Sequence, residues 1–222
     1  MEKKLIQLLN LNKDDLLPVL GIVALPWLLV HVVTAGVMLL LRPDESIFIS
    51  GMLLPICVGL SAFMATSGNT MVTFSHAVKF SATRKTALKL TLLQTLLESA
   101  LALVLGVALL AFERNLAMPI WRVLSGNMGL LVDDFGYVWW AIPAGAAAGY
   151  LIGLWYGTLV LRYSRKGFWL FYFLCIGSPA ALQLLPWKTH EVTNILIPVL
   201  IAALIFSAVW SIWALLRLSI TK

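Results

Sequence analysis

Charged side chains are scarce in this sequence. They make up 12% of its 222 residues, whereas soluble globular domains carry about 25%. Apolar residues reach 61% and the mean hydropathy is +0.94. So little charge excludes an ordinary soluble domain. Because a bilayer offers the backbone no hydrogen-bonding partners, a chain of this composition is predicted to form an all-α integral membrane protein.

Cysteines and the patterns of familiar catalytic sites are also rare or missing. The two cysteines, Cys57 and Cys175, lie in apolar runs, which indicates neither a disulfide framework nor a metal site. The sequence has no GxxxxGK, HExxH, CxxC or GxSxG motif. The three histidines, His31, His76 and His190, fall in three different segments. We therefore expect no catalytic residue, metal or cofactor in this chain, so that energy for any work comes from a partner or a gradient.

Long apolar runs dominate what is present. A helix needs about 20 apolar residues to cross a hydrocarbon core of about 30 Å. Six stretches meet that length, at residues 16–41, 47–66, 86–112, 137–161, 168–187 and 194–216. We predict a single transmembrane domain over residues 1–222 with six spans. Lysines flank a run of apolar residues in residues 1–15, which predicts either an interfacial helix or a cytosolic tail ahead of the first span.

The basic residues are distributed unevenly over the predicted loops. If successive spans alternate in direction, twelve of the 16 basic residues share the side of the N-terminus. The four on the other side are Arg42, Arg114, Arg122 and Lys188. Cytoplasmic loops carry such an excess, so both termini are predicted to be cytoplasmic. This topology accounts for the net charge of +6 without a nucleic-acid partner.

The longest basic segment, residues 70–89, separates the second and third predicted spans. It holds Lys79, Arg84, Lys85 and Lys89 and no acidic residue. We predict a cytoplasmic loop over residues 70–85. A basic and partly apolar loop suits docking into a cleft of a soluble protein or binding to the anionic headgroups of membrane lipids.

The third predicted span carries polar residues on one face, namely Thr91, Gln94 and Glu98. A carboxyl group in hydrocarbon costs about 2.5 kcal/mol or more, so Glu98 should face protein or water. The three residues could line a substrate path or a proton-linked switch, or they could form hydrogen bonds between packed helices. His31 lies in the first span, where a lone histidine is more often a packed side chain than a proton carrier.

An external loop is predicted over residues 113–136.

The fourth predicted span has a glycine at every fourth position, at Gly145, Gly149, Gly153 and Gly157. Small residues on one stripe let two helix backbones approach closely in lipid. We predict that this face packs against another helix, either in the same chain or across a dimer axis.

Several of these residues resemble a known family. The segment Phe74-x5-Phe80-x2-Thr83-Arg84-Lys85, on the cytoplasmic side between the second and third of six spans, resembles the ABC-2-type permease subunits of bacterial ABC transporters. The glycine-rich fourth span, followed by Arg165-Lys166-Gly167, is also similar to the family pattern.

The resemblance implies a multi-pass subunit of the bacterial plasma membrane that exports a peptide, a lipid or an amphiphilic toxic compound. It implies dimerisation with itself or with a sibling permease, and docking of a separate ATP-binding cassette subunit that holds ATP and Mg²⁺. The residues it assigns to ATPase coupling are Phe74, Lys79, Phe80, Thr83, Arg84 and Lys85.

Two other functions remain open from the residues alone. Glu98, Gln94 and His31 would suit a gradient-driven carrier or channel, which predicts flux without an ATPase. A membrane scaffold or sensor that moves no solute would use the glycine stripe for assembly only. Neither the substrate nor the direction of transport is indicated by the sequence.

Overall fold

The protein is all-helical wherever its structure is described. The computed structural model describes residues 13–41, 50–79, 83–117, 119–120, 138–173 and 189–217. Nearly all of these residues are helical and none of them lies in a strand. The predicted all-α fold class is therefore confirmed. Residues 1–12 of the interfacial segment, residues 121–136 of the external loop, residues 174–187 of the fifth span and Phe80 lie outside the described residues.

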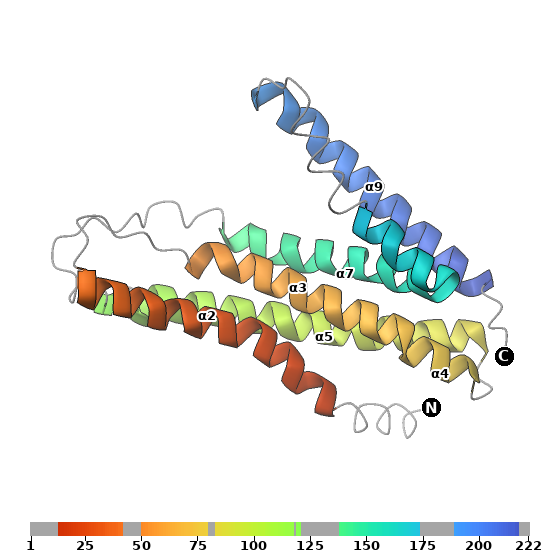
Figure 1. Ribbon diagram of the computed structural model, residues 1–222, viewed down its shortest axis with the longest axis horizontal. Helices are drawn as coiled ribbons and strands as arrows, with labels where there is room; N and C mark the ends of the chain where they lie inside the picture. Colours follow the sequence, from red (N-terminus) through yellow and green to blue (C-terminus); the bar gives the residue numbers. More distant parts are fainter. Residues whose placement is uncertain are drawn as a thin grey trace. The chain divides into compact units, whose positions relative to one another are not determined.

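Five long helices and several short ones make up the described chain (Figure 1). Their order is α2 (Lys13–Leu41), α3 (Ser50–Met71), α4 (Thr73–Lys79), α5 (Arg84–Phe112), the π-helical turn η1 (Glu113–Ala117), α7 (Val138–Tyr163) and α9 (Thr189–Arg217). A further helical segment over residues 165–173 follows α7 after a turn at Ser164. Helix α5 thus continues through η1 past Phe112, where the sequence predicted the span to end.

Three described helices are long and apolar enough to cross a membrane. They are Leu53–Lys79, Arg84–Ala117 and Trp139–Tyr163. Two shorter apolar helices, Leu17–Val33 and Ile201–Arg217, are also present among the described residues. The chain therefore has the character of a membrane protein, while six spans and the side of each terminus stay predictions.

The chain divides into two compact units. One consists of Met1–Ala62 and Leu97–Gly149, and the other of Phe63–Leu96 and Tyr150–Lys222. Because the boundaries fall inside α3, α5 and α7, each of these helices contributes one segment to each unit. The two units are called unit 1 and unit 2 below.

In unit 1, backbones come close together where glycines of α7 face α3. A Cβ atom added to Gly145 would lie 2.5 Å from the carbonyl oxygen of Pro55, and one added to Gly149 would lie 2.0 Å from that of Gly59. A Cβ on Gly106 of α5 would likewise lie 2.5 Å from Val58. Gly145 and Gly149 face backbone atoms, so only residues without a side chain fit there, and these two glycines set the distance between α3 and α7.

In unit 2, the same stripe of α7 continues against α3. A Cβ on Gly153 would lie 2.6 Å from the carbonyl oxygen of Phe63, and one on Gly157 would lie 2.7 Å from the Cβ of Thr70. The helix that faces the stripe in both units therefore belongs to the same chain. A subunit partner would have to contact a different face.

Candidate functional site

The residues expected to couple to an ATPase lie where α3 gives way to α5, in unit 2. We call residues 73–79 and 83–85 the α4–α5 corner. The chain passes from α3 to α4 through one turn residue, Val72, whose N–H donates to Gly68 O at 2.8 Å and whose carbonyl accepts from His76 N at 2.9 Å. Both hydrogen bonds have helical spacing, so the helical hydrogen bonding continues from α3 into α4 across Val72.

Phe74 fixes the corner to the rest of unit 2. Its side chain is 1% exposed and belongs to an apolar cluster drawn from four helices. The other buried members are Ala87 and Leu88 of α5, Leu154 of α7 and Leu215 of α9. Phe74 is therefore a core residue beneath α4, and α4 cannot shift without disturbing the helices that share this cluster.

Thr83 begins α5 as its N-cap. Its side-chain oxygen accepts a hydrogen bond from the backbone N–H of Thr86 at 3.3 Å, and the two hydroxyl groups lie 2.8 Å apart. This is the N-cap to N3 pattern that satisfies one of the orphan N–H groups at a helix start. Thr83 thus has a structural role that requires no partner.

Lys79, Arg84 and Lys85 are exposed on the same corner. The first turn of α5 contains no acidic residue. A helix N-terminus favours negative charge, so each cation placed there loses about 0.3–1 kcal/mol rather than gaining it. Lys79 lies in the last turn of α4, where a cation is favourable. Helix stability does not explain Arg84 and Lys85, which leaves membrane topology or an anionic partner as their physical reason.

The polar face of α5 is linked to α3 in unit 2. Gln94 donates a hydrogen bond from Nε2 to Asn69 Oδ1 at 2.9 Å, and the same oxygen accepts from Thr73 Oγ1 at 3.1 Å. Thr91 is fully buried. In unit 1, Glu98 is 4% exposed. Two of the expected pathway residues therefore share unit 2, whereas Glu98 belongs to unit 1.

A second buried carboxylate occurs in unit 1 at Glu113. This residue opens the π-helical turn η1 and is 0% exposed. Trp27 of α2 donates a hydrogen bond from Nε1 to Glu113 Oε2 at 2.9 Å. The Trp27 ring also lies 4.2 Å from the His31 ring and 5.9 Å from that of Phe112, centroid to centroid. π-Helical turns occur frequently at functional sites, which makes this cluster a second candidate.

Sequence reasoning missed Glu113 and Trp27. Glu113 directly follows an apolar run and precedes Arg114, so it reads as the first residue of a loop. One signal was present in the sequence. The apolar run ending at Phe112 is already longer than one span requires, so membrane thickness does not fix the residue at which the helix ends. Such a helix can extend beyond its last apolar residue and still bury the next side chain.

Replacing Trp27 with phenylalanine should destabilise unit 1 because Glu113 loses a buried donor. A buried hydrogen bond to a carboxylate contributes about 1.5–3 kcal/mol. We expect the melting temperature of the detergent-solubilised protein to fall clearly in Trp27→Phe. Trp140 is 64% exposed, so Trp140→Phe is the matched control and should melt as the wild type does. Equal melting temperatures for both variants would show that the bond is not formed.

Comparison of the chain with protein-family models, curated proteins and solved structures gave no match. The resemblance to ABC-2-type permeases therefore depends on the residues quoted from the sequence. Among the described residues, no group of three or more His, Cys, Asp or Glu side chains could hold a metal ion.

Proposed function

We propose that this chain is the membrane-spanning permease subunit of an ABC transporter in a bacterial plasma membrane. In this proposal it has six spans and cytoplasmic termini, and it exports a peptide, a lipid or an amphiphilic toxic compound. The observation that supports it best is the α4–α5 corner, which combines exposed basic residues with the buried Phe74. A separate ATP-binding cassette subunit binds ATP and Mg²⁺ and docks on this corner.

The corner is suited to pass on a movement. A partner would contact Lys79, Arg84 and Lys85 from outside, whereas Phe74 contacts the interior. Because interior packing is dense, a displacement of α4 cannot be absorbed locally and shifts the helices packed around Phe74. A docking event is thereby converted into a movement of transmembrane helices.

The proposal also includes a second permease subunit, identical or related. The glycine stripe of α7 is occupied by α3 of the same chain. The dimer contact is therefore expected on another face, and the stripe serves the fold of the single subunit.

Charge reversal at the corner tests the docking role. We expect Arg84→Glu to lower the amount of ATP-binding subunit that co-purifies from native membranes by about tenfold or more, because like charges that face each other across an interface cost several kcal/mol. The measurement is a tagged pull-down followed by identification of nucleotide-binding proteins and an ATPase assay. The Arg84→Glu variant should melt at or slightly above the wild-type temperature, because the side chain is exposed and the first turn of α5 favours a negative charge.

Arg114→Glu is the matched control. Arg114 is also exposed and helical but is predicted to lie on the opposite side of the membrane, so its reversal should leave the pull-down unchanged. Co-purification and ATPase activity that persist in Arg84→Glu would contradict the docking role. Solute flux into vesicles that contain this chain alone, abolished in Glu98→Gln, would instead support a gradient-driven carrier. The burial of Glu98 and Glu113 is the observation that favours this second function.

A further inference from the structure

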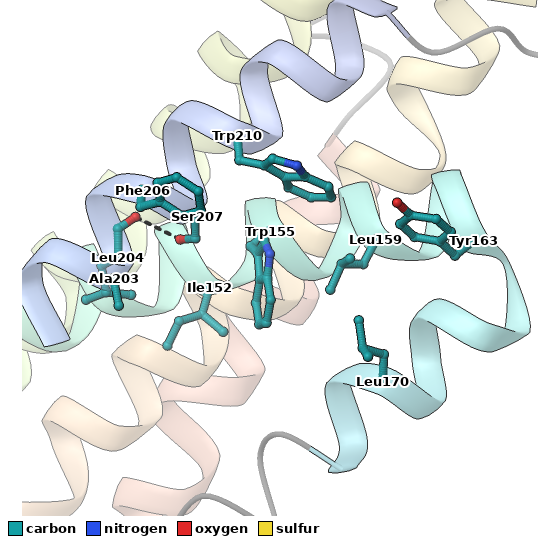
Figure 2. Close-up of a pocket in the computed structure, with 10 residues that line it drawn as sticks. All are labelled: Ile152, Trp155, Leu159, Tyr163, Leu170, Ala203, Leu204, Phe206, Ser207 and Trp210. Carbon is teal, nitrogen blue, oxygen red and sulfur yellow. Dashed lines mark hydrogen bonds between the residues drawn. The ribbon is translucent and has the colours of Figure 1, made fainter. Parts of the chain in front are cut away.

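Unit 2 contains a cavity of about 560 Å³ between α7, the helical segment 165–173 and α9. Figure 2 shows the side chains that line it, with Trp155 and Leu159 from α7, Leu170 from the short segment, and Phe206 and Trp210 from α9. We call this cavity the α7–α9 groove. Its volume falls within the range of about 300–1,000 Å³ that is usual for small-molecule sites.

A tight reversal of the chain forms one wall of the groove. Ser164 has a positive φ of 49°, and its carbonyl accepts hydrogen bonds from Gly167 N at 3.1 Å and Phe168 N at 3.3 Å. A Cβ on Gly167 would lie 2.3 Å from the carbonyl oxygen of Leu159. The glycine therefore lets the segment 165–173 fold back against the end of α7, which brings Leu170 to the groove.

The interior of the groove offers almost nothing to a polar ligand. Ser207 is its hydroxyl-bearing residue from α9, and that hydroxyl already donates to Leu204 O at 2.7 Å (Figure 2). The remaining polar groups are the Tyr163 hydroxyl and the indole N–H groups of Trp155 and Trp210. An alkyl chain fits such a lining, because each buried methylene contributes about 0.8 kcal/mol and needs no hydrogen bond.

One end of the groove is basic. The Arg162 guanidinium carbon lies 5.5 Å from the Tyr163 ring centroid and 5.9 Å from that of Trp210, and both rings line the groove. Arg165 and Lys166 follow within four residues and are exposed. The aromatic rings hold the guanidinium at the mouth, where its remaining N–H groups can donate to an anion.

We propose that the α7–α9 groove binds an anionic phospholipid, with one acyl chain along the apolar lining and the phosphate at Arg162. The occupant is a bilayer lipid because the groove is open to its surroundings, which in a membrane protein are lipid: Phe206 is 72% and Leu170 49% exposed. In the proposed topology Arg162, Arg165 and Lys166 are cytoplasmic, which places the phosphate in the inner leaflet, where anionic lipids attract basic residues. This site does not depend on docking of an ATPase.

Quenching of tryptophan fluorescence tests the site directly. The full-length protein is placed in phosphatidylcholine nanodiscs with a small fraction of brominated phosphatidylglycerol or, in parallel, of brominated phosphatidylcholine. Bromine on an acyl chain in the groove would quench Trp155 and Trp210. We expect stronger quenching by the anionic lipid, and the excess should disappear in the Trp155→Phe/Trp210→Phe double variant.

Two further variants distinguish recognition of the lipid headgroup from binding of its acyl chain. Arg162→Gln should lower the preference for phosphatidylglycerol about fivefold, the factor expected for one basic side chain at an anionic headgroup. Ala203→Phe should fill the groove, because Ala203 lines it, and remove quenching by both lipids at that site. Arg114→Gln is the charge control and should leave the preference unchanged.

The proposal is overturned if the two brominated lipids quench equally, or if Arg162→Gln retains the full preference. It is also overturned if Ala203→Cys yields a disulfide-linked dimer in membranes, since a second copy of the chain would then cover the groove. Loss of ATPase co-purification in Arg84→Glu with unchanged lipid preference would leave this site supported, so its outcome is separate from that of the docking experiment.

Discussion

Substituting Gly149 is expected to disrupt unit 1 more than any other single exchange in the glycine stripe. An added Cβ would lie 2.0 Å from the carbonyl oxygen of Gly59, 2.8 Å from its carbonyl carbon and 3.0 Å from its Cα. All three atoms are backbone, so no rotamer change relieves the overlap and the two helices must separate. Overpacking costs about 1–3 kcal/mol and sometimes more. Gly149→Ala should therefore be strongly destabilised, and Gly149→Leu should not accumulate as folded protein.

Gly68 provides the matched control. It lies in α3, and a Cβ at that position meets nothing within 4 Å. Gly68→Ala removes the entropic cost of a helical glycine and should be neutral or more stable by up to about 1 kcal/mol. The two variants are compared by thermal melting and size-exclusion chromatography in one detergent. Similar melting temperatures for Gly149→Ala and Gly68→Ala would contradict the close contact between α3 and α7.

Truncation of Phe74 should have the second large effect. Phe74→Ala removes a side chain that is 1% exposed and packs in a cluster with residues of α5, α7 and α9. Such a truncation costs about 3–5 kcal/mol, because it adds a cavity to the lost transfer free energy. We expect a large fall in melting temperature of the purified protein, with any loss of ATPase binding following from the altered corner.

Val72 is the control for this prediction. It adjoins α4 and is 56% exposed, so Val72→Ala should change stability by no more than about 0.5 kcal/mol. If Phe74 contacted the ATPase directly, Phe74→Ala would keep the wild-type melting temperature and lose only the co-purified subunit. That result would contradict the burial of the side chain. Phe74→Leu, which keeps most of the apolar volume, should fold and permit the docking assay itself.

The helical class could be predicted from composition, and particular residues show where prediction stopped. Hydropathy predicted the third span from residue 86, whereas α5 begins at Arg84 behind the N-cap Thr83. The end of α5 was not predicted either, because hydropathy falls at Glu113 although the backbone continues through η1. Hydropathy reports what a side chain prefers on average, and Trp27 supplies the specific donor that makes the burial of Glu113 acceptable.

The candidate site was predictable in chemistry but not in placement. The sequence shows that Lys79, Arg84 and Lys85 are basic, and in the structure all three side chains are exposed, as expected for charged residues. Phe74 belongs to the same motif, yet its side chain is buried. The sequence could not predict this burial, because a seven-residue helix gives too short a pattern to decide which face is covered. The α7–α9 groove has no local signal, because its walls come from segments separated by about forty positions and depend on the turn at Ser164.

The hydrogen bonds at Asn69 restrict how the polar face of α5 can be used. A carbonyl-type oxygen has two lone pairs, and Asn69 Oδ1 accepts from both Gln94 and Thr73. A single atom thus joins α3, α4 and α5, and both of its acceptor positions are taken. A polar solute that competes for this oxygen has to displace the hydrogen bond from Gln94 or the one from Thr73 first. A movement of α4 that separates Thr73 from Asn69 would therefore also change the polar surroundings of Gln94 on α5.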